Sequence, residues 1–200
     1  MPTLYHAPRS RSSRFLWLLE EIGEPYDIVY VGIRRGDGSG AGPDERNPHP
    51  LKKVPALVHD GVVVFESPAI ALYLSDLFPQ AALGPQVGEA GRGEYLSWLA
   101  YYGTNVEPGM IGKFTNWAGG PPGMTGWESF DEMEARLAER LTTRSWFLGD
   151  RFSTLDVLFA SLLQWAARMF PEREVYEAYK ARVLARPALA RALAKDEGPA

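Results

Sequence analysis

The hydrophobic pattern changes near residue 80, and this change constrains the fold more than any other feature of the chain. Before it, short apolar runs typical of strands alternate with helical repeats. After it, the apolar residues recur almost entirely at helical spacing. A chain of 200 residues, 46% of them hydrophobic, is long enough to bury two modest cores. We therefore expect an α/β domain over residues 1–79, a linker over 80–88 and an all-helical domain over 89–200.

The first eighty residues predict the order strand, helix, strand, loop, strand, strand, helix. Apolar residues at i, i+3, i+4 and i+7 from Phe15 form one face of a helix that stops at Gly23. The segment His59-Asp60-Gly61 indicates a hairpin turn, and Ser67-Pro68 opens a second helix. The glycine-rich segment 36–43 indicates a loop, and no dinucleotide-binding G-x-G-x-x-G spacing fits it. The expected strands are 3–6, 26–31, 56–58 and 62–65.

The second half predicts helices over 89–114, 127–144 and 154–170, then two shorter ones within 172–195 divided near Pro187. The glycine- and proline-rich segment 119–123 should break the helical pattern. Trp98 and Trp165 are expected in the core.

Composition excludes several function classes. The net charge of −4 and the scattered Lys and Arg give no footprint for nucleic acid or an anionic membrane surface. The apolar runs are too short to span a bilayer, and the N-terminus has no signal-peptide pattern, so a cytoplasmic location is expected. The chain has no cysteine, and its three histidines are too widely spaced to indicate a metal site. Thiol chemistry must therefore arrive with a substrate or cofactor.

Three segments of the first domain are candidates for chemistry. The first is 7–14, where serines and free backbone N–H groups precede a helix; it is either an anion site or a simple serine cap. The second is Val54-Pro55, where the proline enters a strand through either a cis bond or an ordinary trans turn. The third is Glu66-Ser67-Pro68, with Ser67 at the expected N-cap and Pro68 at N1, which is either a carboxylate site or only a well-capped helix.

Together, these motifs resemble the cytosolic glutathione S-transferase family over nearly the whole chain. The pattern Pro8-x-Ser10-x-x-x-Arg14 is similar to the delta and theta classes, while segments 51–57 and 66–70 resemble the glutathione-binding segments. Segment 147–156 resembles the family's hydrophobic staple and capping box, with Ser153 as N-cap and Asp156 at N3. The resemblance implies a thioredoxin-like N-terminal domain and a helical-bundle C-terminal domain.

The resemblance also implies roles for individual residues. Ser10 would face the glutathione sulfur, and the Val54 backbone, beside a cis-Pro55, would pair with the cysteinyl unit. Glu66 and Ser67 would hold the γ-glutamyl end. Lys53 would reach the glycyl carboxylate, and His49 would contact the tripeptide or else be an exposed loop residue.

Two departures bear on the thiol-activating residue. Arg9 stands where these classes commonly have glycine, and Ser12 and Ser13 lie close to Ser10. Ser12 and Ser13 are nearer the helical run, where capping is their natural role.

The implied reaction is activation of glutathione as a thiolate that adds to an electrophilic, largely apolar co-substrate. Tyr101, Tyr102, Phe114 and Trp117, with Met110, occupy the helix that walls the co-substrate cleft in the family, although Tyr101 or Tyr102 could equally be core. The alternatives are a non-catalytic interaction or regulatory protein of the same fold, or a glutathione-dependent isomerase, peroxidase or dehalogenase. The resemblance further implies a homodimer.

Overall fold

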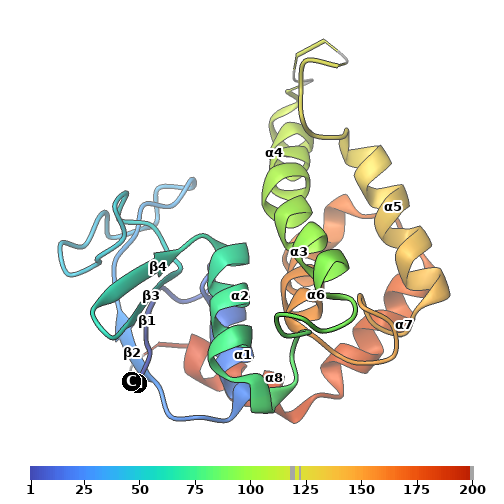
Figure 1. Ribbon diagram of the computed structural model, residues 1–200. Helices are drawn as coiled ribbons and strands as arrows, with labels where there is room; N and C mark the ends of the chain where they lie inside the picture. Colours follow the sequence, from blue (N-terminus) through green and yellow to red (C-terminus); the bar gives the residue numbers. More distant parts are fainter. Residues whose placement is uncertain (118–119, 122, 199–200) are drawn as a thin grey trace. The chain divides into compact units, whose positions relative to one another are not determined.

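The computed structural model describes residues 1–117, 120–121 and 123–198, and the chain forms two compact units (Figure 1). Unit 1 contains residues 1–82 together with the chain from 184 onward, and unit 2 contains residues 83–183. The sequence interpretation places everything from 89 to 200 in the helical domain. The structure differs because the C-terminal helix packs on the first helix of unit 1.

Unit 1 is built on a four-stranded mixed sheet. The strands are β1 (Thr3–His6), β2 (Asp27–Tyr30), β3 (Ala56–His59) and β4 (Val62–Phe65), in the spatial order β2-β1-β3-β4. β1 runs parallel to β2 and antiparallel to β3, and β3 and β4 form the expected hairpin. With its helices, this sheet is the thioredoxin-like domain that the sequence predicts.

The two helices of unit 1 that precede residue 80 begin and end close to their predicted limits. Helix α1 (Ser13–Ile22) ends at Gly23, whose φ of 76° is the left-handed conformation that glycine adopts readily. Helix α2 (Ser67–Leu77) is followed by the short 3₁₀ helix Pro79–Ala81. The predicted N-cap of α2 is wrong by one residue: Glu66 occupies the N-cap position, so Ser67 is the first helical residue and Pro68 the second.

Helix α8 (Pro187–Asp196) completes unit 1 by packing along α1 (Figure 1). Its contact combines a small apolar face with ion pairs at the rim. Glu20 pairs with Lys195 and with Arg191, and Glu21 accepts two hydrogen bonds of 2.6 Å from Arg186. The three bonds from Lys195, Tyr26 and Arg191 outweigh the effect of burial and lower the pKa of Glu20 to about 2. The buried residues of α8 are Ala188, Leu189 and Ala192.

Unit 2 is helical within its described residues, as predicted. The first expected helix is interrupted by a π-helical turn (Tyr102–Val106) between α3 (Arg92–Tyr101) and α4 (Glu107–Thr115). The other helices are α5 (Phe130–Thr143), α6 (Thr154–Trp165), the 3₁₀ turn Ala167–Met169, and α7 (Glu174–Leu184), whose last residue falls in unit 1. The predicted break at 119–123 falls partly outside the described residues, at positions 119 and 122.

Aromatic packing and one buried carboxylate organise the core of unit 2. Phe147 and Phe159 stack with ring centroids 3.9 Å apart. The capping box predicted for α6 is present, with Ser153 at the N-cap and Asp156 at N3. Trp98 packs edge-on against Phe147 but is only partly buried. The core position expected for Trp165 is wrong, because its side chain is 65% exposed. In the described part of the chain, no helix is long and apolar enough to cross a membrane.

Candidate functional site

The register of the sheet brings the three candidate segments of unit 1 to one edge. Tyr5 lies opposite Ala56, so continuing the antiparallel register places Ala7 opposite Val54. Ala56 lies opposite Phe65 on the other side, which places Pro55 beside Glu66. The serine loop, the Val54-Pro55 turn and the N-terminus of α2 therefore meet at the same end of the sheet.

The serine loop forms a tight hydrogen-bond cluster between β1 and α1. The Ser10 and Ser12 hydroxyl oxygens lie 2.7 Å apart, and Ser10 Oγ also lies 2.7 Å from the Ala7 carbonyl. Ser12 Oγ accepts from the Ala7 N–H and lies 2.8 Å from Nδ1 of His6. Ser12 is buried, whereas Ser10 is partly exposed. Ser10 is thus the hydroxyl of this pair that an incoming ligand can reach.

Neither Ser12 nor Ser13 caps α1 with its side chain, so the predicted capping role is wrong. Ser12 occupies the N-cap position but makes no side-chain cap bond. Ser13 Oγ instead donates to Oδ1 of Asp196 at 2.6 Å and accepts from the Ser10 N–H. The partners of both hydroxyls lie outside the first helical turn, where the Ser13 and Phe15 N–H groups donate instead to the main-chain carbonyls of Ser10 and Ser12.

Arg9 adopts a backbone conformation that favours glycine, the residue common at this position in the resembled classes. Its φ of 52° is left-handed. The loop is held from two sides, because Arg35 donates to the carbonyls of Pro8 and Arg9 and the Arg9 N–H donates to Asp196. The replacement of glycine therefore does not unfold the loop.

His6 and Asp196 are site residues that sequence reasoning missed. His6 is fully buried, and its Nε2 lies 3.1 Å from Oδ1 of Asp196 at the end of α8. The two atoms are in contact but lack the alignment of a hydrogen bond. Burial raises the pKa of Asp196, but the contacts with His6, Ser13 and the Arg9 N–H outweigh it and hold that pKa below its usual value. No local pattern joins positions 6 and 196.

The second candidate segment has the cis peptide bond that the family resemblance implies, between Val54 and Pro55. Asn47 supports the preceding turn, since its side-chain amide donates to the Lys53 carbonyl at 2.9 Å. Among the described residues, nothing hydrogen-bonds the main-chain N–H or carbonyl of Val54. Those groups can pair with an extended peptide.

His49 is buried at 5% exposure, so the exposed-loop alternative for it is wrong. Its Nδ1 accepts a 3.0 Å hydrogen bond from the Leu51 N–H, and its ring packs edge-on against Phe65 at the end of β4. Burial lowers the pKa of His49; nearby Glu66 opposes that shift and Lys53 adds to it. His49 is therefore a neutral imidazole near pH 7, whose Nε2–H is left to donate.

The third segment presents two polar residues at the start of α2. Glu66 is exposed and has a φ of 71°, a conformation uncommon for a non-glycine residue. Ser67 is buried at 7% exposure, and its hydroxyl makes no hydrogen bond within the described residues. A carboxylate ligand would meet this hydroxyl and the N-terminal N–H groups of the helix together.

The four aromatic residues predicted for the co-substrate pocket differ in exposure. Tyr102 is fully buried and packs edge-on against Phe159, which supports its core role. Tyr101 is partly exposed and donates to Glu128, while Phe114 and Trp117 are 75% and 54% exposed. The last two therefore present apolar surface at the end of α4.

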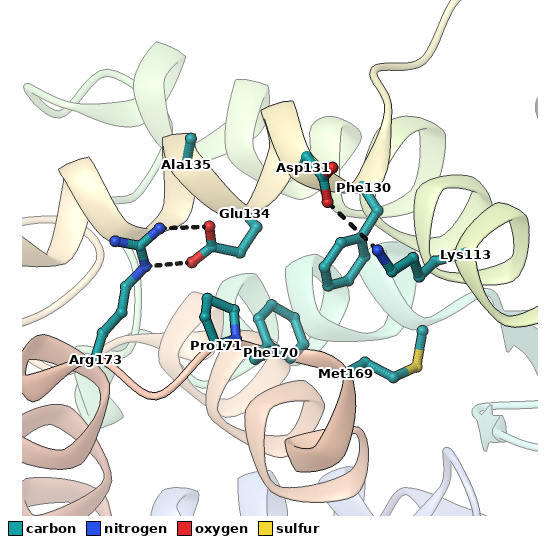
Figure 2. Close-up of a pocket in the computed structure, with 9 residues that line it drawn as sticks. All are labelled: Lys113, Phe130, Asp131, Glu134, Ala135, Met169, Phe170, Pro171 and Arg173. Atoms are coloured by element: carbon teal, nitrogen blue, oxygen red, sulfur yellow. Dashed lines mark hydrogen bonds and ion pairs between the residues drawn. The ribbon is translucent and has the colours of Figure 1, made fainter.

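A separate pocket of about 520 Å³ lies within unit 2, between α5 and the segment before α7 (Figure 2). Its charged residues are paired with each other: Glu134 accepts two hydrogen bonds from Arg173, and Lys113 lies 3.5 Å from Asp131. The pocket contains none of the residues that the sequence singles out. These pairs are already satisfied, so we place the candidate site at the sheet edge of unit 1.

Comparison with known proteins defines the class to which this fold and site belong. The N-terminal domain model of glutathione S-transferase matches residues 2–76, and the C-terminal domain model of the same family matches residues 125–195. The chain belongs to the glutathione S-transferase family.

Individual relatives cover nearly the whole chain. A glutathione S-transferase from Escherichia coli O157:H7, GstA, is 26% identical over 197 residues, 96% of this chain and 98% of its own length. The Escherichia coli K12 disulfide-bond oxidoreductase YfcG is 27% identical, covering 98% of this chain and 96% of its own. The solved structure of a sphingomonad glutathione S-transferase complexed with glutathione is 28% identical and superimposes with a TM-score of 0.77 over 98% of this chain and all of its own.

Proposed function

We propose that this protein is a glutathione transferase that activates the glutathione thiol as a thiolate and transfers it to an electrophilic, largely apolar co-substrate. The observation that carries the proposal is the meeting of three segments at one sheet edge. They supply a reachable hydroxyl at Ser10, an unpaired main chain at Val54 and an unpaired hydroxyl at Ser67.

We assign each glutathione group to the residue whose chemistry suits it. Val54 pairs with the cysteinyl backbone, and the Ser67 hydroxyl with the α2 N-terminus takes the γ-glutamyl carboxylate. The exposed Glu66 carboxylate pairs with the γ-glutamyl amine. Lys53 and the Nε2–H of His49 face the glycyl carboxylate.

The energetic requirement for thiolate formation is modest. A free thiol with a pKa of about 8.5 is only about 3% ionised at pH 7. Lowering the pKa by roughly two units takes about 2.7 kcal/mol of selective stabilisation of the thiolate. In this proposal the stabilisation comes from a charge-assisted hydrogen bond donated by Ser10 and from the positive end of α1.

The co-substrate and the assembly state are parts of the same proposal. Phe114 and Trp117 expose aromatic surface suited to an apolar electrophile. Tyr101, partly exposed at the end of α3, is a further candidate. Family membership supports a homodimer, whose interface would be isologous. Light scattering should therefore give a particle of twice the 22.2 kDa chain mass at micromolar concentration.

Other glutathione-dependent reactions compete with conjugation. Relatives include a probable maleylacetoacetate isomerase of Drosophila melanogaster, 39% identical over 88 residues, and the oxidoreductase YfcG. Thiol exchange by a protein cysteine is disfavoured here, because the chain has none. A non-catalytic role in the same fold predicts that the site binds glutathione weakly or not at all.

The test begins with thermal shift and calorimetric titration of the protein with glutathione. We expect saturable binding, followed by turnover with a panel containing an aryl halide, an enone, an isomerisable enone, a hydroperoxide and a glutathione mixed disulfide. Turnover restricted to the hydroperoxide or the disulfide would replace transfer with a redox reaction. Absence of glutathione binding would support the non-catalytic alternative.

A further inference from the structure

Buried polar side chains continue inward from Ser10 and end on a carboxylate. Ser10 Oγ lies 2.7 Å from Ser12 Oγ, and Ser12 Oγ lies 2.8 Å from His6 Nδ1. On the far side of the ring, Nε2 lies 3.1 Å from Asp196. Three elements supply the groups: the end of β1, the loop before α1 and the end of α8. A serine that only donates to sulfur has no need of an imidazole and a carboxylate behind it.

We propose that this row, Ser10–Ser12–His6–Asp196, is a proton relay in which His6 receives the proton of the glutathione thiol. The proposal rests on the proposed function, because it requires the sulfur to lie against Ser10. His6 and Asp196 act through the serines and are positioning residues for the thiolate.

The hydrogen-bond capacity of the two hydroxyls permits the relay. Ser12 Oγ accepts from the Ala7 N–H, which leaves it one acceptor position for Ser10. The Ser12 proton has two acceptors within reach, His6 Nδ1 at 2.8 Å and the Ala7 carbonyl at 3.3 Å, and the relay uses the first. Ser10 Oγ accepts from the Ser12 N–H, so its second acceptor position is available to a thiol S–H. The Ser10 proton has two acceptors within reach, the Ala7 carbonyl and Ser12 Oγ, and the relay uses the second.

Three proton shifts complete the transfer. The thiol S–H bond breaks and its proton passes to Ser10 Oγ, the Ser10 proton passes to Ser12 Oγ, and the Ser12 proton forms an N–H bond at His6 Nδ1. The products are a thiolate and an imidazolium, and both serines remain neutral. Each hydroxyl now points the opposite way, so that Ser10 donates to the thiolate and the His6 Nδ1–H donates to Ser12.

One carboxylate and one aromatic ring contact the His6 ring. Asp196 contacts Nε2 from α8, and Tyr30 of β2 packs edge-on with its ring centroid 5.5 Å away. The Tyr30 hydroxyl donates to the Lys195 carbonyl and so faces away from the ring as a donor. Of the nearby cations, Arg9 approaches through its main chain, and Arg35 donates to the loop carbonyls. A charged His6 therefore meets one carboxylate at contact distance.

Proton counting distinguishes the relay from a purely structural His6. We propose calorimetric titration with glutathione at pH 7 in two buffers of different ionisation enthalpy, together with ultraviolet thiolate absorbance. In the wild type, fewer protons should reach the buffer than thiolates form. In His6→Asn, which keeps a polar partner for Ser12, each remaining thiolate should release one proton. In Asp196→Asn, the thiolate population should fall about tenfold, as expected when one opposite charge near the acceptor is lost.

Lys195→Gln is the matched control. Lys195 precedes Asp196 on α8 and pairs with Glu20 and Tyr26, so this variant loosens the same helix without touching the relay. Its proton count should equal that of the wild type. A second measurement on the wild type keeps the relay testable if Asp196→Asn misfolds. In the ¹⁵N spectrum of protein with labelled histidine, glutathione should convert His6 to the imidazolium.

Failure of the relay and failure of the proposed function give different results. If the wild type releases one proton per thiolate, or if His6 stays neutral beside a bound thiolate, the relay is wrong and the transferase function stands. If the wild type binds no glutathione, the proposed function fails and the relay fails with it.

Discussion

The N-termini of α1 and α6 begin with similar residues and use them differently. At α6, the Asp156 carboxylate accepts from the Ser153 N–H and hydroxyl three residues away, and also from the Phe147 N–H and the Tyr179 hydroxyl. At α1, Ser12 and Ser13 turn away from their own helix, toward His6 and Asp196. A carboxylate is therefore part of both ends, but only α6 uses it to close the helix.

This difference indicates that the N-terminus of α6 serves stability, whereas the N-terminus of α1 is available to a ligand. The α6 group is fully buried and its polar atoms are mutually satisfied, so it stabilises the core of unit 2. The α1 group leaves Ser10 partly exposed, so its hydroxyl keeps bonding capacity for a ligand. Substitutions at α1 should therefore change the reaction, whereas substitutions at α6 should change stability.

The largest effect on activity is expected for Ser10→Ala. Loss of one preorganised donor to the thiolate should lower kcat on the order of 10²–10³-fold. Glutathione affinity should change little, because we propose that Val54, Glu66 and Ser67 hold the rest of the tripeptide. Steady-state kinetics and calorimetry check both values. A loss of affinity with unchanged kcat would give Ser10 a binding role instead.

Asp156→Ala should produce the largest loss of stability. Removing the carboxylate leaves the Phe147 N–H, the Ser153 N–H and the Tyr179 hydroxyl buried without an acceptor, at a cost of roughly 3 kcal/mol or more. Urea denaturation measures the change. Ser129→Ala, at the exposed capping box of α5, is the control and should cost about 1 kcal/mol. Equal losses of stability at the two positions would mean that Asp156 contributes no more than an exposed helix cap.

The pH dependence of stability gives a second test at α6. Burial outweighs the hydrogen bonds that Asp156 accepts and raises its pKa to about 6. Because this folded-state pKa lies above the ordinary value, the folded protein holds the proton more tightly than the unfolded chain. The resulting stability should be lost as pH rises from about 4 to 6, by up to about 3 kcal/mol relative to Asp156→Asn. Denaturation of both proteins at pH 4.5 and 7 should show it; a constant difference would contradict it.

Glu66→Ala should affect ligand binding rather than stability. Its carboxylate is exposed at the start of α2, and its proposed partner is the γ-glutamyl amine. Glutathione should bind more weakly by roughly 1.5–3 kcal/mol, the scale of a hydrogen bond to a charged group. Calorimetry with glutathione and with a derivative lacking the amino group tests the pairing, since only the first should lose affinity. Equal losses for both ligands would mean a different orientation of the tripeptide.

The smallest effect is expected for Ser13→Ala. This substitution removes the 2.6 Å hydrogen bond to Asp196 and a contact with the Ser10 N–H. Stability should fall by about 1–2 kcal/mol, since the bond joins a neutral donor to a carboxylate. Thermal denaturation checks the value, and turnover should stay within a few-fold of the wild type. A hundredfold loss of turnover would move the catalytic hydroxyl to Ser13.

The sequence predicts features whose determinants are local. The capping box of α6 spans four residues, and the stop of α1 needs only Gly23, so both follow from propensity and spacing. The order of strands and helices before residue 80 follows from hydrophobic periodicity for the same reason.

Features that depend on distant residues could not be predicted. Ser13 resembles a cap until the structure places Asp196, 183 residues away, within hydrogen-bond distance. The chain has three histidines, and the residues around His6 do not distinguish it from the other two. Only the packing of α8 brings a carboxylate into contact with its ring. Trp165 follows the helical repeat, yet it lies at the end of α6 beyond the packed surface and is exposed. Periodicity shows which residues share a face but not where that face ends.

Thiolate absorbance of bound glutathione against pH tests the central claim most directly, in the wild type and in the alanine variants of Ser10, Ser12 and Ser13. The wild type should form thiolate with a midpoint about two units below that of the free thiol. Ser10→Ala should move the midpoint upward, and Ser13→Ala should leave it nearly unchanged. The claim would be contradicted if Ser12→Ala or Ser13→Ala abolished the thiolate at low pH while Ser10→Ala retained it.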